Sequence, residues 1–229
     1  MIYGLIIAAG NQSRFKMETP KALVSIGGSS LLDDNIRKMS IVCDVVKVVC
    51  STTNAHHFSG YDTIVIDSGF GCGDAVYKAL MALGDVTSAD TCFIQWGDSL
   101  VDEGMYSETI DNYSGELVIP CKTETDPYVG IVNIGDGVVQ VMFSKYGEKL
   151  SSGLHDMSLF YGNIDKLMRH TQEFVHKFFD GTSYIHRHGN EFQFLDLLND
   201  TGLCACTYET EFDGFSFNTV EEMINFGKR

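Results

Sequence analysis

Short apolar runs alternate with amphipathic stretches along the first hundred residues of this chain. Runs made mostly of Ile, Val, Leu and Ala are typical of strands buried on both faces, and apolar residues three to four positions apart are typical of helices. The predicted strands cover residues 2–8, 45–50, 63–67 and 91–95, and the predicted helices cover residues 31–39 and 71–83. Strands that alternate with helices predict right-handed crossovers and a Rossmann-like α/β fold, in which helices flank a mostly parallel sheet.

The pattern changes after residue 115. Strand-like segments separated by short turns indicate a small part with antiparallel pairing, and we predict these strands at residues 116–121, 130–134 and 138–143. The remaining elements are predicted as helices at 165–178 and 191–198, a strand at 203–208 and a closing helix at 219–226.

The length of 229 residues is enough for one sizeable core, and no segment has the Pro, Ser or charge content of a linker, so we predict a single domain over residues 1–229. No basic region precedes the first apolar run, and no segment has 18 consecutive apolar residues. The seven cysteines include no C-x-x-C pair, which favours reduced, buried thiols. We therefore expect a cytoplasmic protein without a membrane span.

The charge of the chain limits its partners. There are 16 Lys and Arg against 31 Asp and Glu, which gives a net charge of −15. This charge repels polyanions at long range and argues against nucleic acid or an anionic membrane as a partner. A phosphorylated substrate must then be bound by local cations, and we expect a divalent metal ion to supply further positive charge.

The first predicted strand runs into a loop that is suited to binding phosphate. Ala9 and Gly10 leave room for a base or phosphate to approach the backbone, and unpaired N–H groups in such a loop can bind an anion. Arg14 and Lys21 add two cations. Because ligands bind at the carboxyl ends of parallel strands, we predict that this loop binds a nucleoside triphosphate.

Two oxygen donors are candidate metal ligands at the same edge of the sheet. Asp98 follows a buried strand and a glycine, and Asn218 follows a second apolar segment. Mg²⁺ takes one or two oxygen ligands from protein and fills its octahedron with water and substrate phosphate. Turn or helix-cap roles are the alternative for both residues, and such roles are compatible with metal binding.

The loop also carries a resemblance. It is similar to the signature L-A-A-G-x-G-[ST]-R, spacer, P-K of nucleotidyltransferases with a GT-A-like fold, and most like that of sugar-1-phosphate nucleotidyltransferases. The matching residues are Ala8, Ala9, Gly10, Asn11, Gln12, Ser13, Arg14, Pro20 and Lys21. Gln12 stands where the family has its second glycine, so a side chain occupies a position where backbone normally lies against the triphosphate.

Further motifs extend the resemblance over nearly the whole chain. The run that ends at Asp98 resembles the family's G-D motif, whose Asp binds the metal, and the segment at Asn218 resembles the closing [DN]-T-P-E element, which completes the metal site. A third motif, G-T-[GA]-x-A-[VL], lies against base and ribose in the family and is matched by Gly71, Cys72, Gly73 and Asp74. Cys72 replaces the usual hydroxyl residue.

In the second half, Tyr128 and Gly130 resemble the family's Y-G-V-V segment, and Lys145 resembles the Lys of E-K-P, which reaches the sugar phosphate. Ser144 and Tyr146 depart from that motif. By resemblance, residues 1–115 mainly bind the nucleotide, and residues 116–229 mainly bind the acceptor and supply the closing helix.

The resemblance implies a Mg²⁺-dependent enzyme in which a sugar 1-phosphate attacks the α-phosphorus of a nucleoside triphosphate, with CTP or UTP favoured. Pyrophosphate leaves, and the NDP-sugar serves pathways such as capsule or cell-surface polysaccharide synthesis. In this reaction Arg14 stabilises the leaving pyrophosphate, Lys21 contacts the α-phosphate and Lys145 holds the acceptor. A homodimer is compatible with this reading.

Three alternatives remain open. The first is a cytidylyltransferase for a non-sugar phosphate, such as a phospho-alcohol, phosphonate or phospho-amino-acid. The second is a catalytically silent nucleotide-binding regulatory subunit, suggested by Gln12 and Cys72. The third is a GT-A glycosyltransferase, which is disfavoured because Asp98-Ser99-Leu100 is not a D-x-D motif. The pairs His56-His57 and His186-x-His188 lack a third ligand at a recognisable spacing, so we assign no metal site to them.

Overall fold

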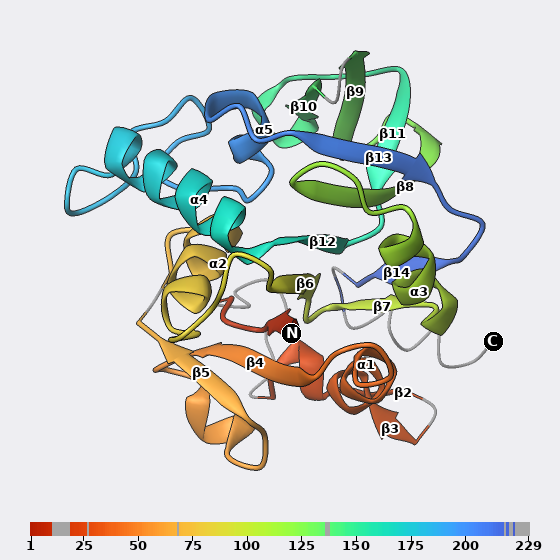
Figure 1. The fold of residues 1–229 in the computed structure, drawn as a ribbon, viewed down its shortest axis with the longest axis vertical. Helices are drawn as coiled ribbons and strands as arrows, with labels where there is room; N and C mark the ends of the chain where they lie inside the picture. Colours follow the sequence, from red (N-terminus) through yellow and green to blue (C-terminus); the bar gives the residue numbers. More distant parts are fainter. Residues whose placement is uncertain are drawn as a thin grey trace.

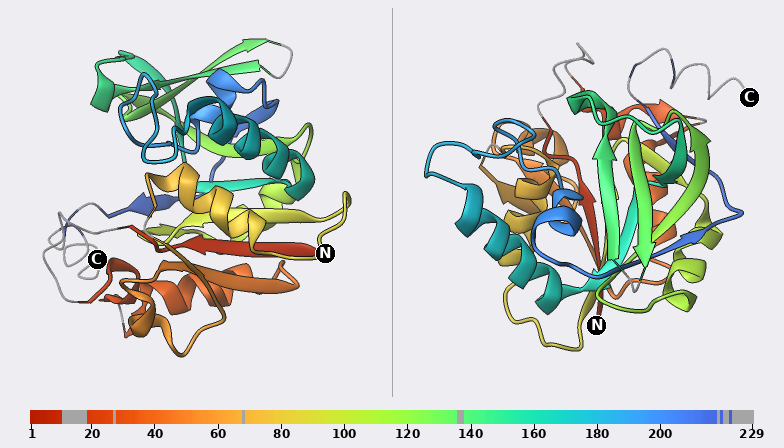
Figure 2. Two further views of the ribbon diagram at one scale, coloured as in Figure 1. Left: turned by 90° about the vertical axis from the view of Figure 1, so that its left-hand side faces the viewer. Right: turned by 90° about the horizontal axis from the view of Figure 1, so that it is seen from above.

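The computed structural model describes residues 1–10, 19–26, 28–67, 69–135, 138–217, 219 and 222. A ten-stranded mixed sheet forms its centre, in the order β10-β9-β11-β8-β12-β6-β1-β4-β5, with β13 paired to β8 (Figure 1). Helices lie on both faces of the sheet (Figure 2). This arrangement confirms the predicted α/β fold.

The parallel half of the sheet contains the predicted N-terminal strands. They are β1 (Ile2–Ile7), β4 (Val45–Ser51), β5 (Thr63–Ile66) and β6 (Thr91–Trp96), and β1 pairs in parallel with both β4 and β6. The predicted helices are α1 (Leu31–Met39) and α2 (Cys72–Met81), which ends two residues earlier than expected. All these elements are confirmed, because strands that helices cover on both faces of a sheet have the continuous apolar runs from which they were predicted.

The second half contains β8 (Leu117–Thr125), β9 (Val129–Gly135), β10 (Val138–Phe143), β11 (Ser152–Asp156), β12 (Leu159–Asn163) and β13 (Ala205–Glu209). Strand β12 pairs with both β6 and β8, and so joins the two halves. Helix α4 (Ile164–Phe178) begins after Asn163, whose side chain accepts a hydrogen bond from the Lys166 amide.

The predicted antiparallel pairing is present between β9 and β10, but the consecutive strands β8 and β9 do not pair with each other. Both β8 and β9 pair antiparallel to β11, which lies between them. Strands β8 and β9 therefore run in the same direction, and residues 126–128 are a bend rather than a reversing turn. Pro127 in this bend has no N–H to donate to a hairpin.

The predicted helix at 191–198 is also wrong over its first half, since α5 spans only Asp196–Asp200. The amide of Phe192 donates to the carbonyl of Phe70, and its carbonyl accepts from the amide of Gly73. These tertiary hydrogen bonds hold residue 192 against the start of α2 and override its local helical pattern.

Several short elements have no counterpart in the predicted pattern. Besides β11 and β12 they are β2 (Ser25–Ile26), β3 (Ser29–Ser30), β7 (Ser99–Val101), α3 (Glu103–Asp111), η1 (Lys21–Leu23), η2 (Ala55–Phe58) and η3 (Ser144–Tyr146). Strand β14 (Gly214–Ser216), in contrast, overlaps the apolar segment predicted before Asn218. The closing helix predicted at 219–226 lies outside the described residues, apart from positions 219 and 222.

Two apolar cores lie on opposite faces of the sheet. One contains buried side chains of α2, α4 and α5, such as Val76, Leu167 and Leu197. The other contains side chains of α1 and α3, such as Leu32 and Met105. Within the described part of the chain, no helix combines the length and apolarity needed to cross a membrane.

Candidate active site

The carboxyl ends of β1 and β6 bring the first loop next to Asp98. Ile7 and Trp96 are neighbours in the parallel register, and the Gly97 amide donates to the Ile7 carbonyl over 2.9 Å. Gly10 and Asp98 therefore leave the sheet at the same edge, as predicted for the carboxyl ends of parallel strands.

Lys21 connects this edge to the C-terminal segment. Its Nζ lies 3.4 Å from Asp98 Oδ2 and donates to the Phe217 carbonyl over 3.2 Å. The Phe217 amide in turn donates to the Asp98 carbonyl over 3.0 Å. Three segments that are distant in sequence thus meet here. Asn218, the other expected metal ligand, lies outside the described residues, as do Asn11, Gln12, Ser13 and Arg14.

Two cavities open at this edge and share Cys72, Trp96 and Asp98 in their walls. The smaller, of about 370 Å³, is also lined by Ala9, Gly10 and Gly71, and the larger, of about 720 Å³, by residues of β8, β11 and β14. We refer to them as the small cavity and the large cavity. Asp98 lies on the boundary, where groups bound in the two cavities would meet.

The small cavity contains part of the predicted nucleotide-binding set. Ala8 and Ala9 are buried, and a Cβ placed on Gly10 would meet no atom of the described residues within 4 Å. Gly10 therefore leaves open space beside the backbone, as expected for a position where a ligand approaches. Ala8 does not line the cavity, and its carbonyl accepts a hydrogen bond from Asn54 Nδ2.

The two glycines at the start of α2 leave space that another part of the protein, Phe192, occupies. Gly71 has φ +100°, and a Cβ there would lie 2.4 Å from the Phe192 carbonyl oxygen. A Cβ on Gly73 would lie 2.5 Å from the Phe192 ring. The space that the sequence assigned to base and ribose is, at these two positions, filled by Phe192.

Asp74 is engaged inside the protein. It is buried, accepts from the Tyr184 hydroxyl over 2.8 Å and forms an ion pair with Lys78. It lines neither cavity. These contacts fix the start of α2 against the segment that contains Tyr184.

Cys72 lines both cavities. Its Sγ accepts from the Phe194 amide and lies 3.6 Å from Gln193 Oε1, to which the thiol donates. Burial raises the pKa of the Cys72 thiol to about 12, so it stays neutral at physiological pH. A neutral thiol offers a weak hydrogen bond to a ligand and is a poor nucleophile.

The three residues that the sequence assigns to the acceptor do not lie together in one cavity. Tyr128 lines the large cavity, whereas Gly130 packs against Leu150, whose Cδ1 would lie 2.5 Å from an added Cβ. Lys145 lines neither cavity. Its Nζ forms an ion pair of 3.0 Å with Glu191, which lines the small cavity, and lies 5.0 Å from the centre of the Tyr146 ring.

The large cavity contains an acidic residue that the sequence did not single out. Asp156 is only 6% exposed, and its Oδ1 accepts from the Ser158 amide over 3.0 Å. Burial raises the pKa of its carboxyl group, and within the described ranges no basic side chain forms an ion pair with it. Nothing in the local pattern marked this residue, because its strand, β11, was not predicted.

Other carboxylates share the lining of the large cavity with Asp156. They are Asp98, Glu124 and Asp126. Lys122 also lines it, but its ammonium group is hydrogen-bonded to Asp213. The larger cavity is therefore rich in hydrogen-bond acceptors and negative charge.

The shared edge has donors that suit a hard divalent cation. The Asp98 carboxylate is partly exposed, and the Phe217 carbonyl lies within reach of the same Lys21 ammonium. Oxygen donors of this kind fit Mg²⁺ better than a softer ion. An ion bound at Asp98 would face both cavities.

Comparisons with known proteins agree with this architecture. The sequence profile of the family described as MobA-like NTP transferase domain matches residues 4–148, which is more than half of the chain. HddC from Yersinia pseudotuberculosis, complexed with GMP-PN, has a similar fold, with a TM-score of 0.71 and 16% identity over 100% of this chain and 99% of that chain.

A second similar structure comes from Bacillus anthracis. It is a protein described as a glucose-1-phosphate thymidylyltransferase, in complex with sucrose, with a TM-score of 0.72 and 15% identity over 100% of this chain and 94% of that chain. At such identities the likeness concerns the fold alone. No curated protein sequence matches the chain.

Proposed function

The chain belongs to the MobA-like NTP transferase domain family, and from this premise we propose that it transfers a nucleotidyl group from a nucleoside triphosphate to the phosphate of a sugar 1-phosphate. The observation that carries the proposal is the pair of cavities that meet at Asp98, beside Lys21. A two-substrate displacement needs such a meeting point.

In the proposed reaction an acceptor phosphate oxygen forms a bond to the α-phosphorus, and the bond from that phosphorus to the β-phosphate oxygen breaks, so that pyrophosphate leaves. Positioning and charge neutralisation account for most of the catalysis in such transfers. Lys21 would contact the α-phosphate, and Arg14 would stabilise the leaving pyrophosphate. A phosphate that is ionised near neutral pH needs no general base.

Asp98 and Asn218 would hold Mg²⁺, which supplies positive charge to the reacting phosphates when bound. Lys21 lies 3.4 Å from the Asp98 carboxylate and would supply a second positive charge on the same side. The small cavity would take the triphosphate, with CTP or UTP as the favoured substrates. The residues that line it mostly precede residue 115, which fits the proposed division of the domain.

The large cavity would take the acceptor. Asp156 and Glu124 offer carboxylate oxygens to the hydroxyl groups of a sugar, and Tyr128 borders the same space. Lys145 would hold the acceptor phosphate only after its ammonium group exchanges Glu191 for the ligand.

A second candidate acceptor is favoured by the charge of the large cavity. Among the described residues, four carboxylates line it, and the one lysine in its lining is already bound to Asp213. An acceptor that carries an ammonium group together with its phosphate, such as an amino-alcohol phosphate, an aminophosphonate or a phospho-amino-acid, would complement this charge better than a neutral sugar.

Release of pyrophosphate from a panel of four nucleoside triphosphates and three groups of acceptors tests these proposals. The acceptor groups are sugar 1-phosphates, amino-bearing phosphates and matched phosphates without the amino group. Turnover with sugar 1-phosphates supports the first candidate, and turnover with amino-bearing phosphates alone supports the second. Nucleotide binding without turnover for any acceptor would overturn both and favour a silent regulatory subunit.

A further inference from the structure

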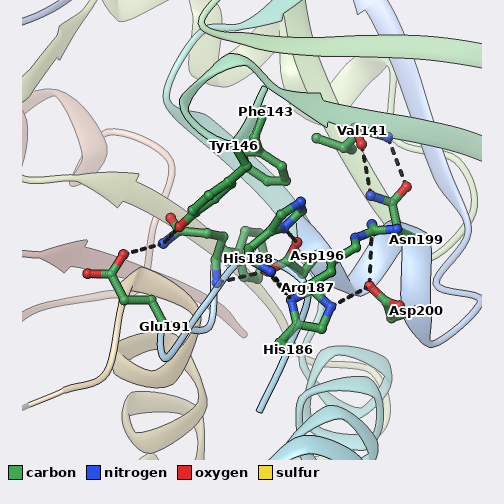
Figure 3. A network of polar contacts seen from close by, with 12 residues as sticks. Val141, Phe143, Tyr146, His186, Arg187, His188, Glu191, Asp196, Asn199 and Asp200 are labelled. Atoms are coloured by element: carbon green, nitrogen blue, oxygen red, sulfur yellow. Dashed lines mark hydrogen bonds and ion pairs between the residues drawn. The ribbon is translucent and has the colours of Figure 1, made fainter. Parts of the chain in front are cut away.

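A cluster of two histidines and one aspartate lies apart from the two cavities, between α4 and α5. His186 and His188 come from the turn before α5, and Asp196 is the first residue of that helix. Their side chains are 2%, 1% and 0% exposed, respectively. One donor atom from each lies within 4.8 Å of the other two, and Figure 3 shows the three side chains converging.

Both imidazoles present Nδ1 to the same carboxylate. His188 Nδ1 lies 2.7 Å from Asp196 Oδ1, and His186 Nδ1 lies 3.7 Å from Asp196 Oδ2. The sequence analysis found no third ligand for the two histidines. The structure supplies it, because residues 191–193 are not helical and the chain turns back to place Asp196 beside them.

The outer nitrogens of both imidazoles also face carboxylates. His186 Nε2 lies 3.1 Å from Asp200 Oδ2, and His188 Nε2 lies 3.4 Å from Glu148 Oε2. Histidines that bind a metal through one nitrogen usually donate the N–H of the other to a carboxylate, which fixes the ring and its tautomer. Both rings of this cluster have that arrangement.

One buried atom of the cluster has no hydrogen bond. His188 Nε2 is fully buried and has no hydrogen-bond partner among the described residues, since its contact with Glu148 does not satisfy hydrogen-bond geometry. An unpartnered buried polar atom is costly, and its presence calls for an explanation. If Nδ1 were bound to a metal ion, the ring proton would reside on Nε2 and face the Glu148 carboxylate.

We propose that His186, His188 and Asp196 bind a zinc ion, or another divalent transition metal of similar preference, with Asp200 and Glu148 orienting the two imidazoles. Two nitrogen donors and one carboxylate suit zinc, whereas Mg²⁺ prefers oxygen donors alone. When Nδ1 of His188 binds the ion, the ring takes the tautomer that carries its proton on Nε2, so the proton of Nδ1 is exchanged for one on Nε2. Donors of a tetrahedral zinc ion are about 3.3 Å apart, so the 2.7 Å contact must open slightly.

The proposed ion would brace one wall of the active site. Asp196 Oδ2 accepts from the Gln193 amide over 3.1 Å, and Gln193 lines the large cavity. The His188 ring stacks on Tyr146 at 4.4 Å with an interplanar angle of 10°. The ion would therefore be structural, and it would be distinct from the cation proposed at Asp98.

Equilibrium dialysis of the full chain tests this proposal. Protein stripped with a chelator is dialysed against Zn²⁺ in the presence of excess Mg²⁺, and bound zinc is measured by elemental analysis. We expect one zinc ion per chain. Co²⁺ in place of zinc should give the visible absorption of a tetrahedral site. These two readouts need neither a variant nor turnover, so they stay interpretable whether or not the proposed nucleotidyl transfer is correct.

Variants then locate the ion. His188→Asn and Asp196→Asn should each weaken zinc binding at least roughly 100-fold, and Asp200→Asn roughly 10- to 100-fold, because it removes an orienting carboxylate. The double variant His56→Asn/His57→Asn is the matched control, since these neighbouring rings, 3.9 Å apart, belong to the surface turn η2.

The control should bind zinc like the unmodified chain. Failure of the unmodified chain to retain zinc would overturn the proposal and leave a hydrogen-bonded histidine-carboxylate network. Zinc binding that is unchanged in a folded His188→Asn variant, checked by circular dichroism, would overturn it as well. Loss of binding in the His56/His57 variant alone would assign the ion elsewhere.

Discussion

The two cavities that meet at Asp98 are lined in different ways. The small cavity is formed by small residues and backbone at the ends of parallel strands, with Asp98 and Glu191 as its acidic residues. The large cavity is formed by side chains of an antiparallel region and contains four carboxylates and several aromatic rings.

This difference suggests that the two cavities recognise their ligands by different means. Backbone and small residues suit a ligand with a constant triphosphate, since any residue supplies N–H groups to phosphate. Side chains with charge and shape discriminate between acceptors, because each unpaired buried group penalises the wrong ligand. We therefore expect changes at the shared edge to affect every acceptor, and changes in the large cavity to affect acceptors selectively.

The largest effect is expected at the shared edge. Lys21→Ala or Asp98→Ala should cost roughly 3–4 kcal/mol of transition-state stabilisation, on the order of 10²- to 10³-fold in turnover, as for other preorganised electrostatic groups. The loss should be equal for all accepted acceptors. Lys47→Ala removes a surface ion pair with Asp62 and is the control. Near-normal turnover in a folded Lys21 or Asp98 variant would contradict the assignment.

The next effect concerns the buried carboxylate of the large cavity. Asp156→Asn should lower kcat/KM for an amino-bearing acceptor by about 10- to 100-fold, which corresponds to losing one charged hydrogen bond. The KM for the nucleoside triphosphate should not change. Steady-state kinetics with both substrates varied would measure this split. An equal rise in both KM values would show that the two cavities do not bind the acceptor and the triphosphate independently.

Gly10, which lines the small cavity, and Gly73, in the first turn of α2, provide a matched pair. Gly73→Ala places a Cβ 2.5 Å from the Phe192 ring and should lower the free energy of unfolding by about 1–3 kcal/mol, as expected for overpacking. In Gly10→Ala the added Cβ meets no atom of the described part of the chain within 4 Å, so the change should leave stability nearly unchanged while raising the KM for the triphosphate. Urea unfolding and kinetics of both variants would test this. Equal destabilisation would contradict it.

Variants of Lys145 and Glu191 test whether the Lys145 ammonium group leaves its ion pair with Glu191 to bind the acceptor phosphate. Lys145→Met should raise the acceptor KM about tenfold, since one charged contact of about 1.4 kcal/mol is lost. Glu191→Gln should lower that KM a few-fold, because Lys145 is released from its ion pair. If Lys145→Met leaves the acceptor KM unchanged, Lys145 does not bind the acceptor, and its ion pair with Glu191 is only structural.

The smallest effect is the pH dependence of stability that Asp156 imposes. Its pKa is raised by burial, so the folded state binds more protons than the unfolded state above the ordinary pKa of an Asp. Its contribution to stability therefore falls as the pH rises through that ordinary value toward the folded-state pKa. Asp156→Asn should remove this decline and raise the midpoint of thermal unfolding at neutral pH. Melting curves over a pH series would measure it, and a lower midpoint would be the contrary result.

The sequence predicted the region around the small cavity well. Buried parallel strands such as β1 and β6 have continuous apolar runs, and their order of crossovers is constrained, so the position of Gly10 and Asp98 at one edge of the sheet follows from local pattern and topology. The roles assigned to these residues, and to the undescribed Arg14 and Asn218, stay predictions.

The region around the large cavity was less predictable for physical reasons. Strand β11 is short and mixed in polarity, and its place between β8 and β9 depends on residues that are far apart in sequence. Phe192 follows a helical pattern, yet its backbone pairs with the loop before α2. Nothing local marks Asp156 as a cavity residue or Asp196 as a partner of His188. These features arise from tertiary contacts that outrank local propensity.

The reciprocal contacts of Phe217 have a consequence for the order in which the site is made. Its amide donates to the Asp98 carbonyl, and its own carbonyl accepts from Lys21, while β14 just before it pairs with β7. Synthesis is directional, so both earlier segments leave the ribosome long before residue 217. A nascent chain can thus form its parallel strands early, yet the edge where the two cavities meet acquires the Phe217 carbonyl only after residue 217 has been added.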